Sequence, residues 1–141
     1  MQTPSVPESA TISFRARLRT RWSDEDNHGV LNNAVYLTLL EEARHAYFSK
    51  LGAMRGAFFP FLLAQTNARF LRPGRGACDV DVEVVTTHVG STSLAQAYRV
   101  VFGDEVWCEA EAILVFCETP GGGKAPVPDE VRAAIEAFER R

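Results

Sequence analysis

A single long segment with helical periodicity, set among several segments with strand periodicity, limits the fold of this chain more than any other feature. Residues 33–50 carry apolar side chains at helical spacing, in a band wider than a narrow stripe. We therefore expect one long helix that is enclosed on several sides. Asn32 or Asn33 is expected to cap its start, and Gly52 follows its end.

The other ordered segments alternate apolar and polar residues, as half-buried strands do. The predicted strands cover residues 11–22, 61–71, 78–89, 92–102 and 105–118. Short turns join the last three strands, which predicts a meander. A final short helix over residues 130–140, capped by Asp129, is expected after a glycine-rich loop. One helix against an antiparallel sheet of about five strands is an α+β two-layer fold.

Size and composition exclude several classes of protein. The 141 residues fit one domain over residues 11–141, after a flexible N-terminal arm at residues 1–10. A net charge of −3 does not suggest the strongly basic face that nucleic-acid binding requires. No apolar run suggests a membrane span or a secretory signal. Three cysteines without metal-like spacing argue against a disulfide framework, and the simplest location is the cytoplasm. We expect neither a metal nor a cofactor.

An acidic turn joins the first strand to the long helix. Residues 22–33 read WSDEDNHGVLNN, and a carboxylate there can meet the backbone N–H groups of the helix start. Asp24 and Asp26 are two positions apart, so one side chain can enter a cleft while the other supports the turn. Gly29 permits a close approach of the backbone. Asp24, Asp26 and Asn27 are also common in ordinary turns. A chemical role for the acids and a purely structural role in the turn therefore both stay open.

Residues 21–44 carry a pattern of acids, glycine and tyrosine that matches a known family. The acidic turn has the form D-x-D-x-x-G, and Asn32-Asn33, Tyr36 and an E-x-A-R segment at residues 41–44 follow. In these features the chain resembles the hotdog-fold acyl-CoA thioesterases of the 4-hydroxybenzoyl-CoA thioesterase family. The resemblance implies a hotdog fold, in which the sheet wraps around the helix, and hydrolysis of an acyl-CoA to free acid and CoA. It also implies a homodimer or homotetramer with sites between subunits.

The resemblance assigns roles to individual residues. Asp26 matches the catalytic carboxylate, which either attacks the thioester carbonyl or activates water as a general base. Backbone N–H groups near Asn33 match the oxyanion hole, and Gly29 keeps the turn close to it. Further candidates for substrate binding are His28, Asn32, Arg72 and Arg75.

The chain departs from the family pattern in two places. Many relatives carry a histidine after the glycine, whereas His28 precedes Gly29 here, and others carry histidine at the position of Asn33. His28 is therefore either a substrate-facing residue or a solvated turn residue. The hairpin at residues 90–92 lacks the basic residues that hold CoA phosphates in some relatives. Arg69, Arg72 and Arg75 either bind the CoA phosphates in their place or are ordinary charged residues at strand ends.

Two other charged groups have structural interpretations. The resemblance implies that the first strand pairs with residues 78–89, so its arginines would face Asp79, Asp81 and Glu83 rather than a phosphate. Glu41 and Arg44 share a helix face and are expected to pair with each other or to hold a neighbouring subunit.

Three functions follow from these features, and an acyl-CoA thioesterase leads. A hotdog enoyl-thioester dehydratase or hydratase is the first alternative, but the chain lacks the D-x-N-x-x-H pattern that we expect for it. The second alternative is a non-catalytic protein that binds an acyl chain or an acyl carrier. The sequence leaves open the acyl group, the choice between CoA and carrier-protein thioesters, and the choice between dimer and tetramer.

Overall fold

A computed structural model of the protein describes residues 12–54, 56 and 58–140. The expected N-terminal arm, residues 1–10, lies outside the described residues. The elements in chain order are β1 (Phe14–Arg19), the short 3-10 helix η1 (Trp22–Asp24), α1 (Asn33–Lys50), β2 (Phe61–Phe70), β3 (Asp79–Val89), β4 (Ser93–Phe102), β5 (Glu105–Phe116) and α2 (Asp129–Glu139).

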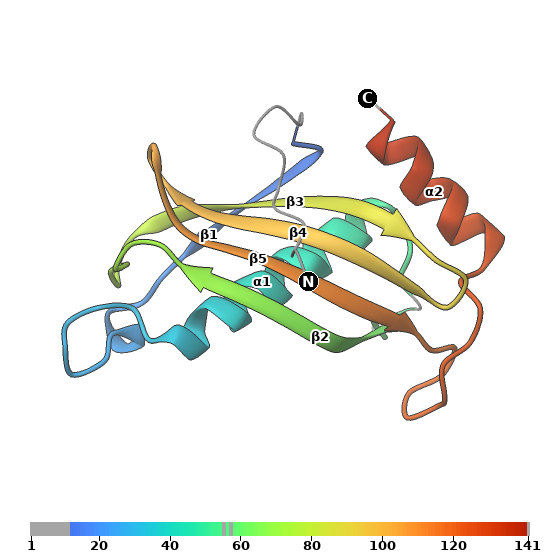
Figure 1. The fold of residues 1–141 in the computed structure, drawn as a ribbon, viewed down its shortest axis with the longest axis horizontal. Coiled ribbons are helices and arrows are strands. Elements are labelled where there is room, and N and C mark those ends of the chain that lie inside the picture. The colour runs from blue at the N-terminus through green and yellow to red at the C-terminus, as the bar shows by residue number, and fades with distance from the viewer. Residues whose placement is uncertain (1–11, 55, 57, 141) are drawn as a thin grey trace.

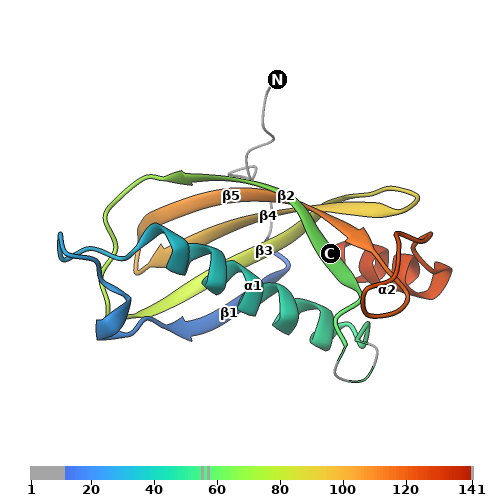
Figure 2. The same cartoon turned by 90° about the horizontal axis from the view of Figure 1, so that it is seen from below.

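The five strands form one antiparallel sheet in the order β1-β3-β4-β5-β2 (Figure 1). Figure 2 shows α1 lying across one face of this sheet, with α2 at one end of it. The strands β3, β4 and β5 make the predicted meander, and β1 and β2 are the edges. The predicted α+β hotdog arrangement and the predicted pairing of β1 with β3 are confirmed.

The core lies between α1 and the sheet face that it covers. Tyr36, Leu40 and Phe48 of α1 are at most 2% exposed, and burial of such a side chain stabilises the fold by about 1.5–3 kcal/mol. Leu37 on the other side of the helix is 42% exposed, and Glu41 is exposed as well. The expectation that the helix is enclosed on several sides is therefore wrong for the single chain, because the sheet curves over one side only.

A chain of hydrogen bonds runs through this core from α1 to α2. Six side chains share it, and each donates to the next: Arg44 Nε to Tyr98 Oη (3.0 Å), Tyr98 to Gln96 Oε1 (2.6 Å), Gln96 Nε2 to Thr86 Oγ1 (3.0 Å), Thr86 to Tyr47 Oη (2.8 Å) and Tyr47 to Glu139 Oε2 (2.5 Å). Arg44 is only 4% exposed. Of the two alternatives for Glu41 and Arg44, the pair between them is therefore wrong, because the guanidinium turns inward to Tyr98. A contact with a neighbouring subunit stays a prediction.

The ends of several elements differ from the predictions: β5 ends at Phe116, two residues early, and the differences at β1 and α2 have a physical reason. Residues 20–22 do not continue β1, and Trp22 begins η1 with 80% of its surface exposed instead of joining the apolar face. The chain turns there because Asp24 accepts hydrogen bonds from Arg21. At the other end, Pro128 occupies the cap position of α2, so Asp129 is the first helical residue and not the cap. Its charge still suits the positive end of the helix dipole.

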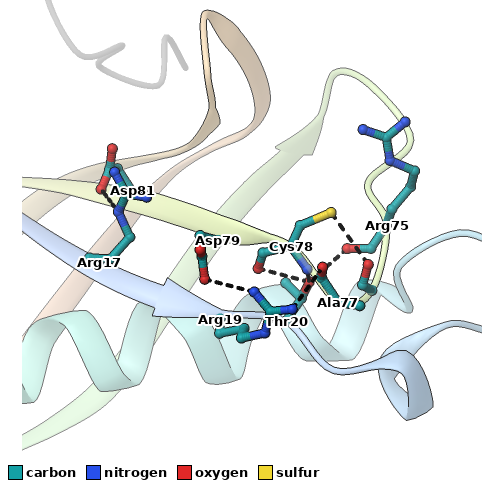
Figure 3. Close-up of polar contacts among 9 residues, drawn as sticks. Arg17, Arg19, Thr20, Arg75, Ala77, Cys78, Asp79 and Asp81 are labelled. Carbon is teal, nitrogen blue, oxygen red and sulfur yellow. Dashed lines mark hydrogen bonds and ion pairs between the residues drawn. The ribbon is translucent and has the colours of Figure 1, made fainter.

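The arginines of β1 pair with acids of β3 on the outer face of the sheet. Arg17 and Arg19 lie 2.9 and 3.0 Å from Asp81 and Asp79 (Figure 3). Exposed pairs of this kind contribute about 0–1 kcal/mol each. These contacts confirm the structural interpretation of the arginine stripe.

Candidate functional site

The acidic turn forms a small closed loop between β1 and α1. The backbone N–H of Asp26 donates to the carbonyl of Val30 at 2.8 Å, and the N–H of Asn32 donates to the carbonyl of Asp24 at 2.9 Å. Gly29 lies at the tip with φ +74°, in the left-handed region that favours glycine. The loop therefore holds Asp26 in a fixed relation to the start of α1.

Asp24 supports this loop from the inside. Its side chain is 7% exposed, and it accepts the backbone N–H of Arg21 at 2.7 Å and the Arg21 guanidinium at 2.9 Å. Burial raises the pKa of Asp24, but these hydrogen bonds outweigh it and hold the pKa below its ordinary value. The prediction that one of the two acids supports the turn is confirmed for Asp24.

Asp26 is oriented by the loop but is not fully engaged in it. Its Oδ1 accepts the backbone N–H of His28 at 2.8 Å, and the residue is partly buried. No hydrogen bond to its Oδ2 is present among the described residues. One carboxylate oxygen thus fixes the side chain, and the other is free to meet a substrate or a water molecule.

The start of α1 presents an unbonded backbone donor. Asn32 caps the helix, with its Oδ1 accepting the N–H of Ala34 at 2.9 Å and its carbonyl accepting the N–H of Val35 at 2.9 Å. In the part of the chain that the structure describes, the N–H of Asn33 has no acceptor. This N–H lies at the positive end of the helix dipole, so it suits an oxygen that develops negative charge.

A pocket of about 220 Å³ lies beside the helix start. It is lined by Val30, Leu31, Asn33, Tyr36, Phe70, Leu71, Arg72 and Pro73. These residues come from the acidic turn, α1 and the end of β2 with the loop that follows it. The N–H of Leu31 donates to the carbonyl of Gly74 at 2.9 Å and so ties the turn to that loop. The structure thereby brings together two of the predicted site residues, Asn33 and Arg72.

The remaining predicted residues lie elsewhere. Asp26 and His28 are not in the lining of this pocket, and the His28 side chain is exposed. Arg75 places its guanidinium 5.3 Å from the centre of the Phe102 ring. Its carbonyl accepts the Thr20 hydroxyl at 2.8 Å, a contact drawn in Figure 3. Arg75 therefore belongs to the junction of the loop with β1 and not to the pocket.

Sequence reasoning missed the walls of the pocket. Tyr36 was visible only as part of the family motif, and Phe70 and Leu71 only as the end of a strand. Gly74 stood out only as part of the Arg72-Pro73-Gly74 turn that ends this strand. A Cβ at Gly74 would lie 2.6 Å from Trp107 and from the Tyr36 hydroxyl, so only glycine lets the loop pack this closely.

The described residues contain neither a candidate metal site nor a helix that could span a membrane. No group of three or more His, Cys, Asp or Glu side chains there could hold a metal ion. In the same part of the chain, none of the helices is long and apolar enough to cross a membrane.

Known proteins match the chain in sequence and in fold. The model of the thioesterase-like superfamily matches residues 20–135. A thioesterase from Thermus thermophilus, whose crystal structure contains coenzyme A and zinc, is 33% identical with a TM-score of 0.81, covering 92% of this chain and 96% of that one. The acyl-CoA thioester hydrolase YbgC of Escherichia coli O6:H1 is 26% identical over 115 residues, 78% of this chain and 85% of its own. The 1,4-dihydroxy-2-naphthoyl-CoA thioesterase Slr0204 from Synechocystis shares the fold, with a TM-score of 0.75. It is 19% identical, and the match covers 86% of this chain and 94% of that one.

Proposed function

The chain belongs to the thioesterase-like superfamily, and from this premise we propose that it hydrolyses an acyl-CoA thioester to the free acid and coenzyme A. The acyl-CoA thioester hydrolase of Escherichia coli and the coenzyme A complex of the Thermus protein support a CoA thioester as the substrate. One observation carries the proposal. A single closed loop holds both the partly engaged carboxylate of Asp26 and the unbonded N–H of Asn33.

In this proposal the N–H of Asn33 donates to the carbonyl oxygen of the thioester. It polarises the carbonyl and stabilises the negative charge that develops on the oxygen as the carbon becomes tetrahedral. Loss of one such donor typically lowers the rate by about 10²–10³. Gly29 keeps the loop tight, so that Asp26 stays in place relative to this donor.

Asp26 acts by one of two routes. As a nucleophile, its free oxygen bonds to the carbonyl carbon and the CoA thiolate leaves; water then hydrolyses the mixed anhydride and restores the carboxylate. As a general base, it takes a proton from the attacking water and passes it to the departing thiolate. In either route the reacting atom is Oδ2 of Asp26, which accepts no hydrogen bond from the described residues.

The test is a hydrolysis assay with short-chain, aromatic and long-chain acyl-CoAs on the wild type, Asp26→Asn and Asp26→Ala. We expect both variants to lose at least ~10²-fold in kcat, the lower range for a positioned acid–base or nucleophilic group. Asn27→Ala, an exposed residue of the same turn, serves as the matched control. If the folded Asp26→Ala variant kept the kcat of the wild type, Asp26 would not be the catalytic carboxylate.

We also propose that the active form contains two copies of the chain, joined at β2, with two such pairs in a tetramer as the larger alternative. β2 is an edge strand, and Leu62 and Leu63 on it are 57% and 47% exposed. An exposed apolar edge with unpaired backbone groups is a template for pairing with another strand. A second β2, running antiparallel, would satisfy those groups and cover the leucines.

A cytoplasmic location completes the proposal. Cys78, Cys108 and Cys117 are all free thiols. Free, unpaired cysteines are typical of proteins in a reducing compartment.

A further inference from the structure

The loop between β2 and β3, residues 71–78, is fixed to the end of β1. Thr20 is 1% exposed, and its hydroxyl donates to the Arg75 carbonyl at 2.8 Å and accepts the N–H of Cys78 at 3.0 Å (Figure 3). Between these contacts Ala77 has φ +56°, a left-handed conformation that is unfavourable for a residue with a Cβ. Such a conformation persists where the surrounding contacts enforce it. The loop is therefore a rigid support beside the acidic turn.

The acidic turn itself has two arms, a first arm at residues 24–26 and a second arm at residues 30–32. Two backbone hydrogen bonds join the arms, and Glu25 and Leu31 face each other between them in an antiparallel bridge. The first arm ends in the Asp26 carboxylate, and the second arm leads into the unbonded N–H at the start of α1. The separation of these two groups therefore depends on how the two arms lie relative to each other.

The rigid loop holds both arms through two of its glycines. The N–H of Gly76 donates to Glu25 Oε2 at 2.8 Å, which holds the first arm. The N–H of Leu31 donates to the Gly74 carbonyl at 2.9 Å, which holds the second arm. Because these glycines are only two positions apart, one short piece of backbone sets the spacing of the two arms.

The glycines cannot shift easily, because their surroundings are close-packed. A Cβ at Gly76 would clash with the Arg21 carbonyl oxygen, and a Cβ at Gly74 would lie 2.6 Å from the Tyr36 hydroxyl. Of the two contacts with the arms, the one at Leu31 joins backbone to backbone, whereas the one at Glu25 depends on a side chain. The hold on the first arm can therefore be removed by substitution.

We propose that Glu25 is a positioning residue for thioester hydrolysis, since its hydrogen bond to Gly76 keeps Asp26 in place relative to the start of α1. The inference rests on the proposed hydrolysis of acyl-CoA. Glu25 acts through Asp26 and has no contact of its own with the substrate. Misplacement of a catalytic group by about 1 Å can lower a rate by about 10²-fold. Loss of the Glu25 contact should therefore lower kcat and leave KM nearly unchanged.

The experiment measures kcat and KM of Glu25→Ala, Glu25→Asp and Glu25→Gln with the acyl-CoA that the wild type hydrolyses fastest. Glutamine has the length of glutamate and keeps an oxygen that can accept the Gly76 N–H, whereas aspartate keeps the charge but is one methylene too short. We expect the Ala and Asp variants to lose about 10–10²-fold in kcat. The Gln variant should keep most of the wild-type kcat.

Glu139 on α2 provides the matched control. Its carboxylate also accepts a backbone N–H from a distant segment, that of Thr86 at 2.9 Å. Figure 2 shows α2 at the opposite end of the sheet from the acidic turn. Glu139→Ala and Glu25→Ala each leave a backbone donor without its partner, so both should lower the midpoint of urea unfolding. Only Glu25→Ala should lower kcat.

The outcomes separate this inference from the function beneath it. Glu25 does not position Asp26 if Glu25→Ala keeps the wild-type kcat, if Glu139→Ala loses as much kcat, or if Glu25→Gln is as slow as Glu25→Asp. Hydrolysis itself would stand in each of these cases. The comparison of the Gln and Asp variants decides the question if Glu25→Ala does not fold. Failure of the folded wild type to hydrolyse any acyl-CoA would overturn both proposals.

Discussion

Two aspartates only two positions apart do different work because their partners differ. Asp24 is enclosed and accepts hydrogen bonds from Arg21, whereas Asp26 uses one oxygen in the turn and keeps the other free. The first acid stabilises the loop, and the second is available for chemistry. Substitutions at the two positions should therefore separate stability from catalysis.

Asp24→Asn should lower the free energy of unfolding in a pH-dependent way. The pKa of Asp24 is lower in the folded state than the ordinary 3.8, so the unfolded state binds more protons and stability rises with pH. The difference between wild type and variant should be complete above pH 5, about one unit above that ordinary value, and shrink as pH falls through the folded-state pKa. Urea unfolding at pH 7, 5, 4 and 3 measures it.

The control for this prediction is Asp79→Asn on β3. Asp79 has a side chain that is 54% exposed and pairs with Arg19 on the surface, so its loss should change stability by less than about 1 kcal/mol at any pH. If the Asp24→Asn difference stayed constant across the pH series, the charge of Asp24 would not be what stabilises the loop.

At the scale of elements, the hydrogen-bonded chain connects α2 to the core. Its donors all point one way, from the buried guanidinium of Arg44 to the carboxylate of Glu139, so the dipoles along it reinforce one another. Burial, followed by the Glu139 carboxylate, raises the pKa of Tyr47, which keeps its phenol protonated as a donor. Thr86 adds its backbone N–H to the same carboxylate at 2.9 Å. Glu139 is therefore one of the contacts that dock α2, beside the Arg132 guanidinium, which donates to the Gly90 carbonyl at 2.9 Å.

Glu139→Ala should destabilise the protein by about 2 kcal/mol, because it removes a charged acceptor and leaves the Tyr47 hydroxyl and the Thr86 N–H without their partner. Glu136 lies one turn earlier on α2 and is exposed. Glu136→Ala should stay within about 0.5 kcal/mol of the wild type. Equilibrium unfolding in urea compares the two variants, and equal effects would argue against the docking role.

At the scale of the whole molecule, the two edges of the sheet differ. β1 carries arginines paired with the acids of β3, and charge on an edge discourages pairing with another strand. β2 instead exposes Leu62 and Leu63. The pocket adjoins the end of this same strand through Phe70 and Leu71. Assembly at β2 would therefore bring a second copy close to the pocket.

Leu62→Glu should weaken this assembly, because two carboxylates would approach each other across the paired edge. Light scattering on a size-exclusion column should show the wild type at twice or four times the 15.6 kDa chain mass and the variant shifted toward one chain. Arg17→Gln on the opposite edge is the control. A monomeric wild type at micromolar concentration would rule out β2 as the site of assembly.

The sequence determined the elements and the position of the acidic turn. Helix α1 begins and ends as the periodicity of residues 33–50 predicted, and the alternation of residues 78–89 predicted β3 to within one residue. These features are local, since helical and strand periods are set by backbone geometry over a few residues. The motif around Asp26 and Gly29 could also be identified from the sequence, because all of its residues lie in one short loop. Its catalytic role stays a prediction.

Only the tertiary structure decided which distant residues meet. Arg44 turned into the core to meet Tyr98, 54 positions away, although its helix spacing also allowed a pair with Glu41. Arg72 came to line the pocket with Asn33, while Arg75, three positions on, packed on Phe102. Such contacts depend on the order of strands in the sheet and on close packing at points such as Gly74. Periodicity in the sequence does not encode these distances, because they arise from the closure of long loops around a shared core.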